Sequence, residues 1–161
     1  MHEVHIDTQL SRKERYELVI KQIEATISIE DDLIANLANT AALLKQALGF
    51  YWIGFYIMKE EELVLGPFQG TVACTRIALD KGVCGAAASR KESILVADVD
   101  QFPGHIACSG ASRSEIVVPL VVGEEVKMIL DIDSDQLDDF TDEDVKYFEQ
   151  VVDLLRARHY S

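Results

Sequence analysis

Three cysteines are the only thiols of this 161-residue chain, and their surroundings favour chemistry over packing. Cys74, Cys84 and Cys108 lie in the turn-rich stretches PFQGTVAC, DKGVCGAA and FPGHIACSG. A free cysteine is most often a small, buried packing residue. A loop or a helix start instead leaves a thiol reachable and able to ionise. The odd number of cysteines argues against a structural disulfide framework, but a transient catalytic disulfide remains open.

Acidic residues form a second candidate cluster. Residues 126–133 alternate as a strand does, so that Asp131 and Asp133 share one face and apolar side chains the other. One interpretation is a solvated face. The other adds Glu115 from the preceding strand, which an odd-length turn at residues 123–125 would place opposite Asp133, whereas a two-residue turn would send it to the core. We favour the odd turn, and carboxyls so crowded should include one with a raised pKa that can donate a proton.

Aromatic and histidine side chains could complete such a site. Trp52 and Tyr56 are four residues apart on a predicted strand and therefore face the same way, as core packing or as an aromatic wall for a small ligand. His105, three residues before Cys108, could lower the pKa of that thiol or could simply bond to the backbone.

Metal sites are disfavoured by the spacing. The series Asp131, Asp133, Asp135 does not continue as a calcium loop, because a glutamine and an aspartate stand where that loop needs glycine and glutamate. Zinc held by the three cysteines and His105 is chemically permissible, but the close cysteine pairs of structural zinc sites are lacking. We therefore expect no metal and no cofactor.

Helices and strands that would position these residues can be assigned from caps and periodicity. Helices are predicted over about 11–28, beginning at the capping box of Ser11 and Glu14, over 31–48, ending at Gly49, and over 141–158, capped by Thr141. Residues 50–134 hold the strands, with hairpin turns at 60–62 and 123–125, a small-residue helix near 83–90 and glycine-rich loops. This order predicts one α+β domain over residues 1–161, with helices on one face of an antiparallel sheet.

Charge and composition exclude several classes of partner. With 15 basic and 28 acidic residues the net charge is −13, which repels nucleic acid and anionic membrane surfaces. The N-terminus lacks the apolar segment of a signal peptide, and the longest apolar run, residues 116–122, is too short to span a bilayer. We expect a cytoplasmic protein.

Five motifs together resemble the free methionine-(R)-sulfoxide reductases, which are single GAF domains. The resemblance covers most of the chain from about the second helix, and the cysteine spacings of ten and twenty-four residues match the family pattern. The motifs are WIGFY (52–56), LGPFQG (65–70), GVCGAAA (82–88), FPGHIACSGASRSEIVVPL (102–120) and LDIDS (130–134).

The resemblance implies a six-stranded antiparallel sheet with the N- and C-terminal helices on one face and a ligand pocket on the other. It implies reduction of free methionine (R)-sulfoxide with thioredoxin as electron donor. Cys108 would attack, and Cys74 and Cys84 would be resolving or relay thiols, with Cys74 favoured to act first. The substrate shell would comprise Trp52, Tyr56, Glu115, Asp131 and Asp133.

The expected chemistry pairs a thiolate with an acid. A sulfoxide sulfur becomes electrophilic when its oxygen is protonated, a role suited to Glu115 or Asp133, and the sulfenic acid left on Cys108 can condense to a disulfide. The carboxylates would hold the α-ammonium group of the free amino acid. The alternative is a GAF sensor module that binds a small ligand or reports oxidant without catalysis. The terminal helices are amphipathic and could pair in a homodimer.

Overall fold

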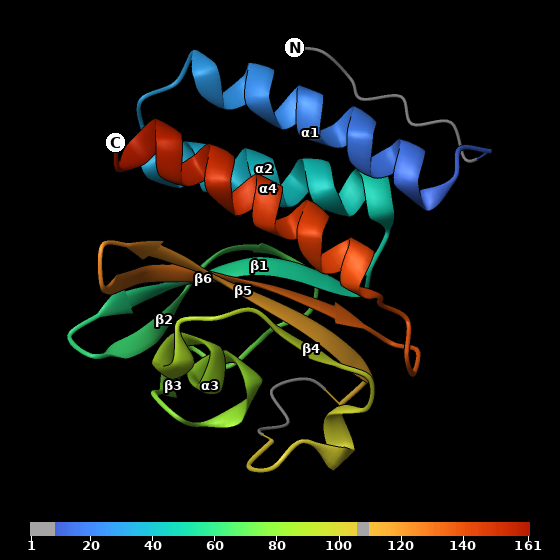
Figure 1. The fold of residues 1–161 in the computed structure, drawn as a ribbon, viewed down its shortest axis with the longest axis vertical. Coiled ribbons are helices and arrows are strands. Elements are labelled where there is room, and N and C mark those ends of the chain that lie inside the picture. The colour runs from blue at the N-terminus through green and yellow to red at the C-terminus, as the bar shows by residue number, and fades with distance from the viewer. Residues whose placement is uncertain (1–8, 106–109) are drawn as a thin grey trace.

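The computed structural model describes residues 9–105 and 110–161. Its elements follow one another in the order α1 (Arg12–Ser28), α2 (Leu33–Leu48), β1 (Trp52–Lys59), β2 (Glu62–Gln69), β3 (Arg76–Ala78), α3 (Gly82–Arg90), β4 (Ile94–Val96), a 3-10 turn (Val99–Gln101), β5 (Ser114–Val122), β6 (Glu125–Ser134) and α4 (Asp142–His159). The strands form one antiparallel sheet in the order β3-β2-β1-β6-β5-β4. Helices α1, α2 and α4 cover one face, and α3 lies on the other (Figure 1). The predicted α+β fold with a six-stranded sheet is confirmed.

The helix ends follow the predicted caps. At the start of α1, the Glu14 amide donates to the Ser11 hydroxyl and the Ser11 amide donates to the Glu14 carboxylate, as a capping box requires. Helix α2 ends at Gly49, whose φ of 70° lies in the left-handed region. Its start is slightly later than predicted, because Asp32 caps the helix and the first helical residue is Leu33.

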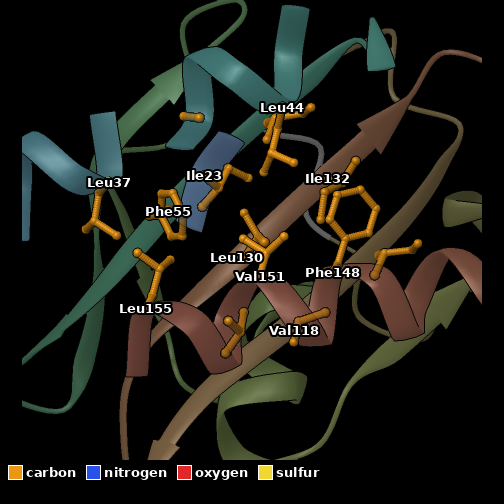
Figure 2. Packing of buried hydrophobic residues seen from close by; sticks show 14 of the residues in the cluster. Ile23, Leu37, Leu44, Phe55, Val118, Leu130, Ile132, Phe148, Val151 and Leu155 are labelled. Carbon is orange, nitrogen blue, oxygen red and sulfur yellow. The ribbon is translucent and has the colours of Figure 1, made fainter. Parts of the chain in front are cut away.

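A continuous apolar layer joins the sheet to the three covering helices. Helix α1 is outermost, and α2 and α4 lie between it and the sheet (Figure 1). Side chains from all three helices and from the central strands interlock in this layer (Figure 2): Ile23, Leu37, Leu44, Phe55, Val118, Leu130, Ile132, Phe148, Val151 and Leu155. Because side chains alternate along a strand, the neighbours of these strand residues point to the opposite face.

The hairpin of β5 and β6 differs from the prediction in its turn. Only Gly123 and Glu124 connect the strands, since Val122 pairs with Glu125, and the expected odd-length turn is therefore wrong. A bulge compensates: Leu120 pairs with Met128, but Val121 pairs with Val126, which leaves Lys127 as an extra residue on β6. The extra residue restores the register that the longer turn would have produced.

A second, smaller apolar cluster lies on the opposite face of the sheet, beneath α3. Its buried members are Trp52, Tyr56, Leu63, Ile77, Val83, Cys84, Ala87, Ala88, Val96, Val99, Val117, Val126 and Ile129. The acidic residues Glu115, Asp131 and Asp133 are buried among these apolar side chains. In the part of the chain that the structure describes, no helix combines the length and the apolar character needed to cross a membrane.

Candidate active site

Three acidic side chains converge on the sheet face beneath α3. Glu115 on β5 pairs directly with Asp133 on β6, and Asp131 lies two residues before Asp133 on the same face. The predicted grouping of the three acids is thus confirmed. Their residues are only 6%, 5% and 8% exposed for Glu115, Asp131 and Asp133 respectively, so the solvated-face interpretation is wrong.

An aromatic stack borders the acids. On β1, Trp52 pairs with Asp133 and Gly54 pairs with Asp131. The rings of Trp52 and Tyr56 lie 6.0 Å apart, centroid to centroid, at 25°. Position 54 must be glycine for this arrangement, because a Cβ there would come within 2.7 Å of the Trp52 ring and 2.3 Å of the Phe68 Cβ. The bare backbone lets the Trp52 ring lie across the strand next to the acids.

The polar atoms of both rings are bound to the loop after β2. Trp52 Nε1 donates to the Thr71 carbonyl at 3.0 Å, and the Tyr56 hydroxyl donates to the Cys74 carbonyl at 2.8 Å. Burial, with a smaller contribution from the charge of Asp131, raises the pKa of Tyr56, which therefore stays a donor. These two bonds hold the Cys74 segment against the sheet. Cys74 itself is half-buried and disulfide-bonded.

Cys84 is a buried free thiol within the acid cluster. It belongs to the first turn of α3, and its Sγ lies 3.8 Å from Oε2 of Glu115. Burial raises the pKa of this thiol well above its usual value, and the charges of Asp131, Glu115 and Asp133 raise it further. Cys84 is therefore a neutral S–H donor, which is a poor nucleophile.

The three acids differ in how readily they ionise. Burial, reinforced by the charge of Asp131, raises the pKa of both Glu115 and Asp133 well above the usual range. Burial raises the pKa of Asp131 as well, but hydrogen bonds from Glu115, Cys84 and Asp133 oppose that shift. Asp131 is accordingly the carboxylate that ionises most readily, while its neighbours retain protons.

One carboxylate oxygen in the cluster is unsatisfied. Oδ1 of Asp131 is buried without a hydrogen-bond partner among the described residues, although one oxygen of Asp133 accepts from the Ser112 hydroxyl at 3.2 Å. A buried acceptor without a donor is costly. A cation or a hydrogen-bond donor at this oxygen would offset that cost.

These side chains line one cavity, together with the start of α3. It brings together the predicted Trp52, Tyr56, Cys84, Glu115, Asp131 and Asp133, and it also includes His105. Cys74 is not among the lining residues, and Cys108 lies outside the described residues.

Ser112 and the two helix residues before Cys84, Gly82 and Val83, also line the cavity, and the sequence analysis did not assign them to the site. Ser112 stands in an irregular segment before β5, where no periodic signal marks a side chain as inward-facing. For α3, small residues predicted a helix near 83–90, but which face of the sheet its start would approach depends on packing.

Comparison with known proteins gives a consistent picture. The GAF domain family matches residues 30–157. A free methionine-R-sulfoxide reductase of Escherichia coli is 45% identical over 91% of this chain and 89% of its own length, and GAF domain-containing protein A of Dictyostelium discoideum is 49% identical over 90% and 92%. A crystal structure of free methionine-R-sulfoxide reductase from Neisseria meningitidis in complex with its substrate superposes with a TM-score of 0.93, at 46% identity over 98% of this chain and 95% of that one.

Proposed function

This chain belongs to the free methionine-R-sulfoxide reductase family of GAF-domain proteins, and we propose that it reduces free L-methionine (R)-sulfoxide in the cavity beneath α3. It is an oxidoreductase that acts on methionine sulfoxide. One observation supports the proposal for this site: a buried cluster of acids lies beside an aromatic stack, and one of its carboxylate oxygens has no partner in the part of the chain that the structure describes.

The acids suit the α-ammonium group of a free amino acid. Asp131 is the most readily ionised of the three, and its Oδ1 has no donor within the described ranges 9–105 and 110–161. An ammonium group carries three donors and a positive charge, so it both supplies a donor and offsets the cost of a buried carboxylate. A methionine residue within a peptide has an uncharged amide instead. The cluster thereby favours the free amino acid over protein-bound sulfoxide.

The start of α3 suits the α-carboxylate. Gly82, Val83 and Cys84 form the first turn of the helix, and all three line the cavity. The N–H of Gly82 donates to the Gly104 carbonyl at 3.1 Å. The N–H groups of Val83 and Cys84 are the ones available to an anion, because N–H groups in a first turn lack intrahelical acceptors and the positive end of the helix dipole favours a negative charge. Acids on the sheet and amides on the helix would thus bind the two ends of a zwitterion, leaving the sulfoxide beside Trp52.

The reduction itself requires a thiolate and an acid. Cys108 is the proposed nucleophile: its thiolate attacks the sulfoxide sulfur while Glu115 or Asp133, each with a raised pKa, protonates the oxygen. Methionine leaves, and the oxygen remains on Cys108 as a sulfenic acid. Cys84 does not suit the attacking role, since burial and three neighbouring acids keep its thiol protonated.

A second thiol then resolves the sulfenic acid. Its thiolate attacks the sulfenic sulfur, the oxygen leaves as water and a disulfide forms. We assign this step first to Cys74, an assignment that the disulfide at Cys74 and the free thiol of Cys84 support. Thioredoxin would reopen the disulfide by thiol exchange. We expect no metal or organic cofactor to be needed.

Turnover of defined substrates tests the recognition step. Free methionine (R)-sulfoxide should be reduced in a reductant-dependent reaction, whereas the N-acetyl compound and the methyl ester should each lose at least about tenfold in kcat/KM, since a charge-assisted hydrogen bond contributes about 1.5 to 3 kcal/mol. Asp131→Ala should raise KM for the free substrate. Equal rates on the free and N-acetylated compounds would remove the acids from substrate recognition and would reopen the sensor alternative.

Thiol variants test the mechanism. Cys108→Ser should abolish turnover, whereas Cys74→Ser should still reduce one equivalent of sulfoxide and then cycle slowly with thioredoxin, because attack and resolution use separate thiols. Cys84→Ser should slow cycling less than Cys74→Ser. Full turnover by Cys108→Ser would contradict the assignment of the nucleophile.

Two further expectations concern the cellular compartment and the oligomeric state of the protein. A thioredoxin-dependent cycle requires a reducing compartment, so we place the enzyme in the cytoplasm. The terminal helices could also pair in a homodimer, and sedimentation of the purified protein would measure its assembly.

A further inference from the structure

We infer that Cys84, Glu115 and Asp131 form a binding site for a zinc ion, and that zinc at this site blocks the substrate. The three residues are buried, and each offers one ligand atom, with all three atoms within 4.8 Å of one another. They come from three elements, α3, β5 and β6, so no spacing in the sequence connects them. The combination differs from the cysteine and histidine set that the sequence analysis weighed and disfavoured.

The distances are close to those of a coordinated ion. Zinc lies about 2.3 Å from a thiolate sulfur and about 2.0 Å from a carboxylate oxygen. Tetrahedral angles then place sulfur and oxygen about 3.5 Å apart. Sγ of Cys84 and Oε2 of Glu115 are already separated by 3.8 Å. Small side-chain rotations would therefore suffice to close the site around an ion.

The charge balance also calls for a cation. Oδ1 of Asp131 is buried and lacks a hydrogen-bond partner among the described residues, and Asp133 adds a further acid to the lining of the same cavity. A divalent cation would neutralise the ionised carboxylate of Asp131 and the Cys84 and Glu115 anions that form on binding, and it would give Oδ1 of Asp131 a partner. When zinc binds, the S–H proton of Cys84 and the carboxyl proton of Glu115 leave to solvent, and Zn–S and Zn–O bonds form.

The thiol of Cys84 determines which metal ion the site prefers. Calcium and magnesium prefer six or more oxygen ligands, many of them water. A compact site of two carboxyls and one thiol provides too few oxygens for them. Zinc accepts sulfur together with oxygen and is satisfied by three protein ligands and one open position. Zinc is therefore the ion that this donor set fits.

Zinc would compete directly with the substrate. This step rests on the proposed function, because the carboxylate of Asp131 is the group that we assign to the α-ammonium of methionine sulfoxide. One cavity cannot hold both cations on the same oxygen. Zinc should raise the substrate concentration needed for half-maximal rate and leave the limiting rate unchanged.

Metal binding can be measured without any sulfoxide. The protein, fully reduced with a phosphine that does not sequester zinc, would be titrated with Zn²⁺ against a colorimetric chelator and with Cd²⁺ by its thiolate charge-transfer absorption. We expect one ion per chain. Cys84→Ser should abolish the thiolate absorption and weaken zinc binding by at least about tenfold, since even indirect supports of a metal site commonly contribute that much.

Two further variants serve as controls for the zinc-binding measurement. Cys74→Ser removes a thiol outside the cluster and should retain both the absorption and the affinity. Asp131→Asn keeps the shape of the side chain and should weaken binding, and circular dichroism would establish that each variant is folded. Unchanged zinc affinity in Cys84→Ser, loss of binding in Cys74→Ser, or no binding by the parent protein would each overturn the metal site.

Single-turnover reduction by the pre-reduced protein, without thioredoxin, tests competition. The half-saturating sulfoxide concentration should rise in proportion to free zinc, and Cys84→Ser should resist this effect. Zinc binding without any such rise would leave the metal site intact, but would overturn both the competition and the placement of the ammonium at Asp131. The two failures are therefore distinguishable.

Discussion

Replacing Glu115 by glutamine should stabilise the protein, and should do so increasingly as the pH rises. Glu115 is 6% exposed, and burial followed by the charges of Asp131 and Asp133 raises its pKa well above the usual value. A carboxyl whose pKa is higher in the folded than in the unfolded chain keeps its proton in the folded state while the unfolded state releases it. Stability then falls as pH rises from about 4, the unfolded pKa, towards the raised folded value.

The size of the effect follows from linkage. Within that window each pH unit lowers the free energy of unfolding by about 1.4 kcal/mol for one such group. For a domain of this size, 1 kcal/mol corresponds to about 2 to 4 °C in Tm. Glutamine cannot ionise, and its amide can still donate to the neighbouring carboxylates. The melting temperature of Glu115→Gln should therefore exceed that of the parent by about 3 to 6 °C for each pH unit traversed inside the window.

Calorimetric or urea unfolding of the reduced protein at a series of pH values from 4 to 8 would measure this difference. Glu124→Gln is the matched control, because Glu124 is exposed in the turn between β5 and β6. That variant should follow the parent at every pH. If Glu115→Gln tracked the parent in parallel, or were less stable than it at pH 8, the assignment of Glu115 as a destabilising buried acid would be refuted.

Three further outcomes are expected. Asp144→Ala should lower the free energy of unfolding by about 2 to 4 kcal/mol in urea titrations, because its buried carboxylate accepts from the Tyr16 hydroxyl at 2.6 Å and caps α4. Gly54→Ala should reduce both stability and substrate affinity, since its Cβ would displace the Trp52 ring, and a normal KM together with a normal melting curve would contradict the close contact. Turnover should decline on the alkaline side as the proton donor ionises, and Asp133→Asn should move or remove that limb of the pH profile if Asp133, whose pKa is raised, is the donor.

The ends of the helices and the faces of the strands could be read from the sequence because they depend on local interactions. Ser11 and Glu14 satisfy each other's backbone donors within one turn, and Gly49 adopts a left-handed conformation that ends α2. Alternation alone places Asp131 and Asp133 on one face of β6, and this holds whatever the strand packs against.

The pairing of Glu115 with Asp133 depended on more than the turn. The prediction reached the correct pair through a three-residue turn, whereas the chain uses two residues and inserts Lys127 as a bulge. A bulge and a longer turn shift the register by the same one residue, so the pattern of apolar residues does not distinguish them.

Only the tertiary structure decided that the acids are buried and which thiol accompanies them. Helix α3 lies across the sheet face and brings Cys84 within 3.8 Å of Glu115, although the two are 31 residues apart. Sequence alone showed three cysteines in similar small-residue settings, with nothing to separate a protonated, buried thiol from a reactive one. That distinction arises from desolvation and from charges on neighbouring strands, which exist only once the chain has folded.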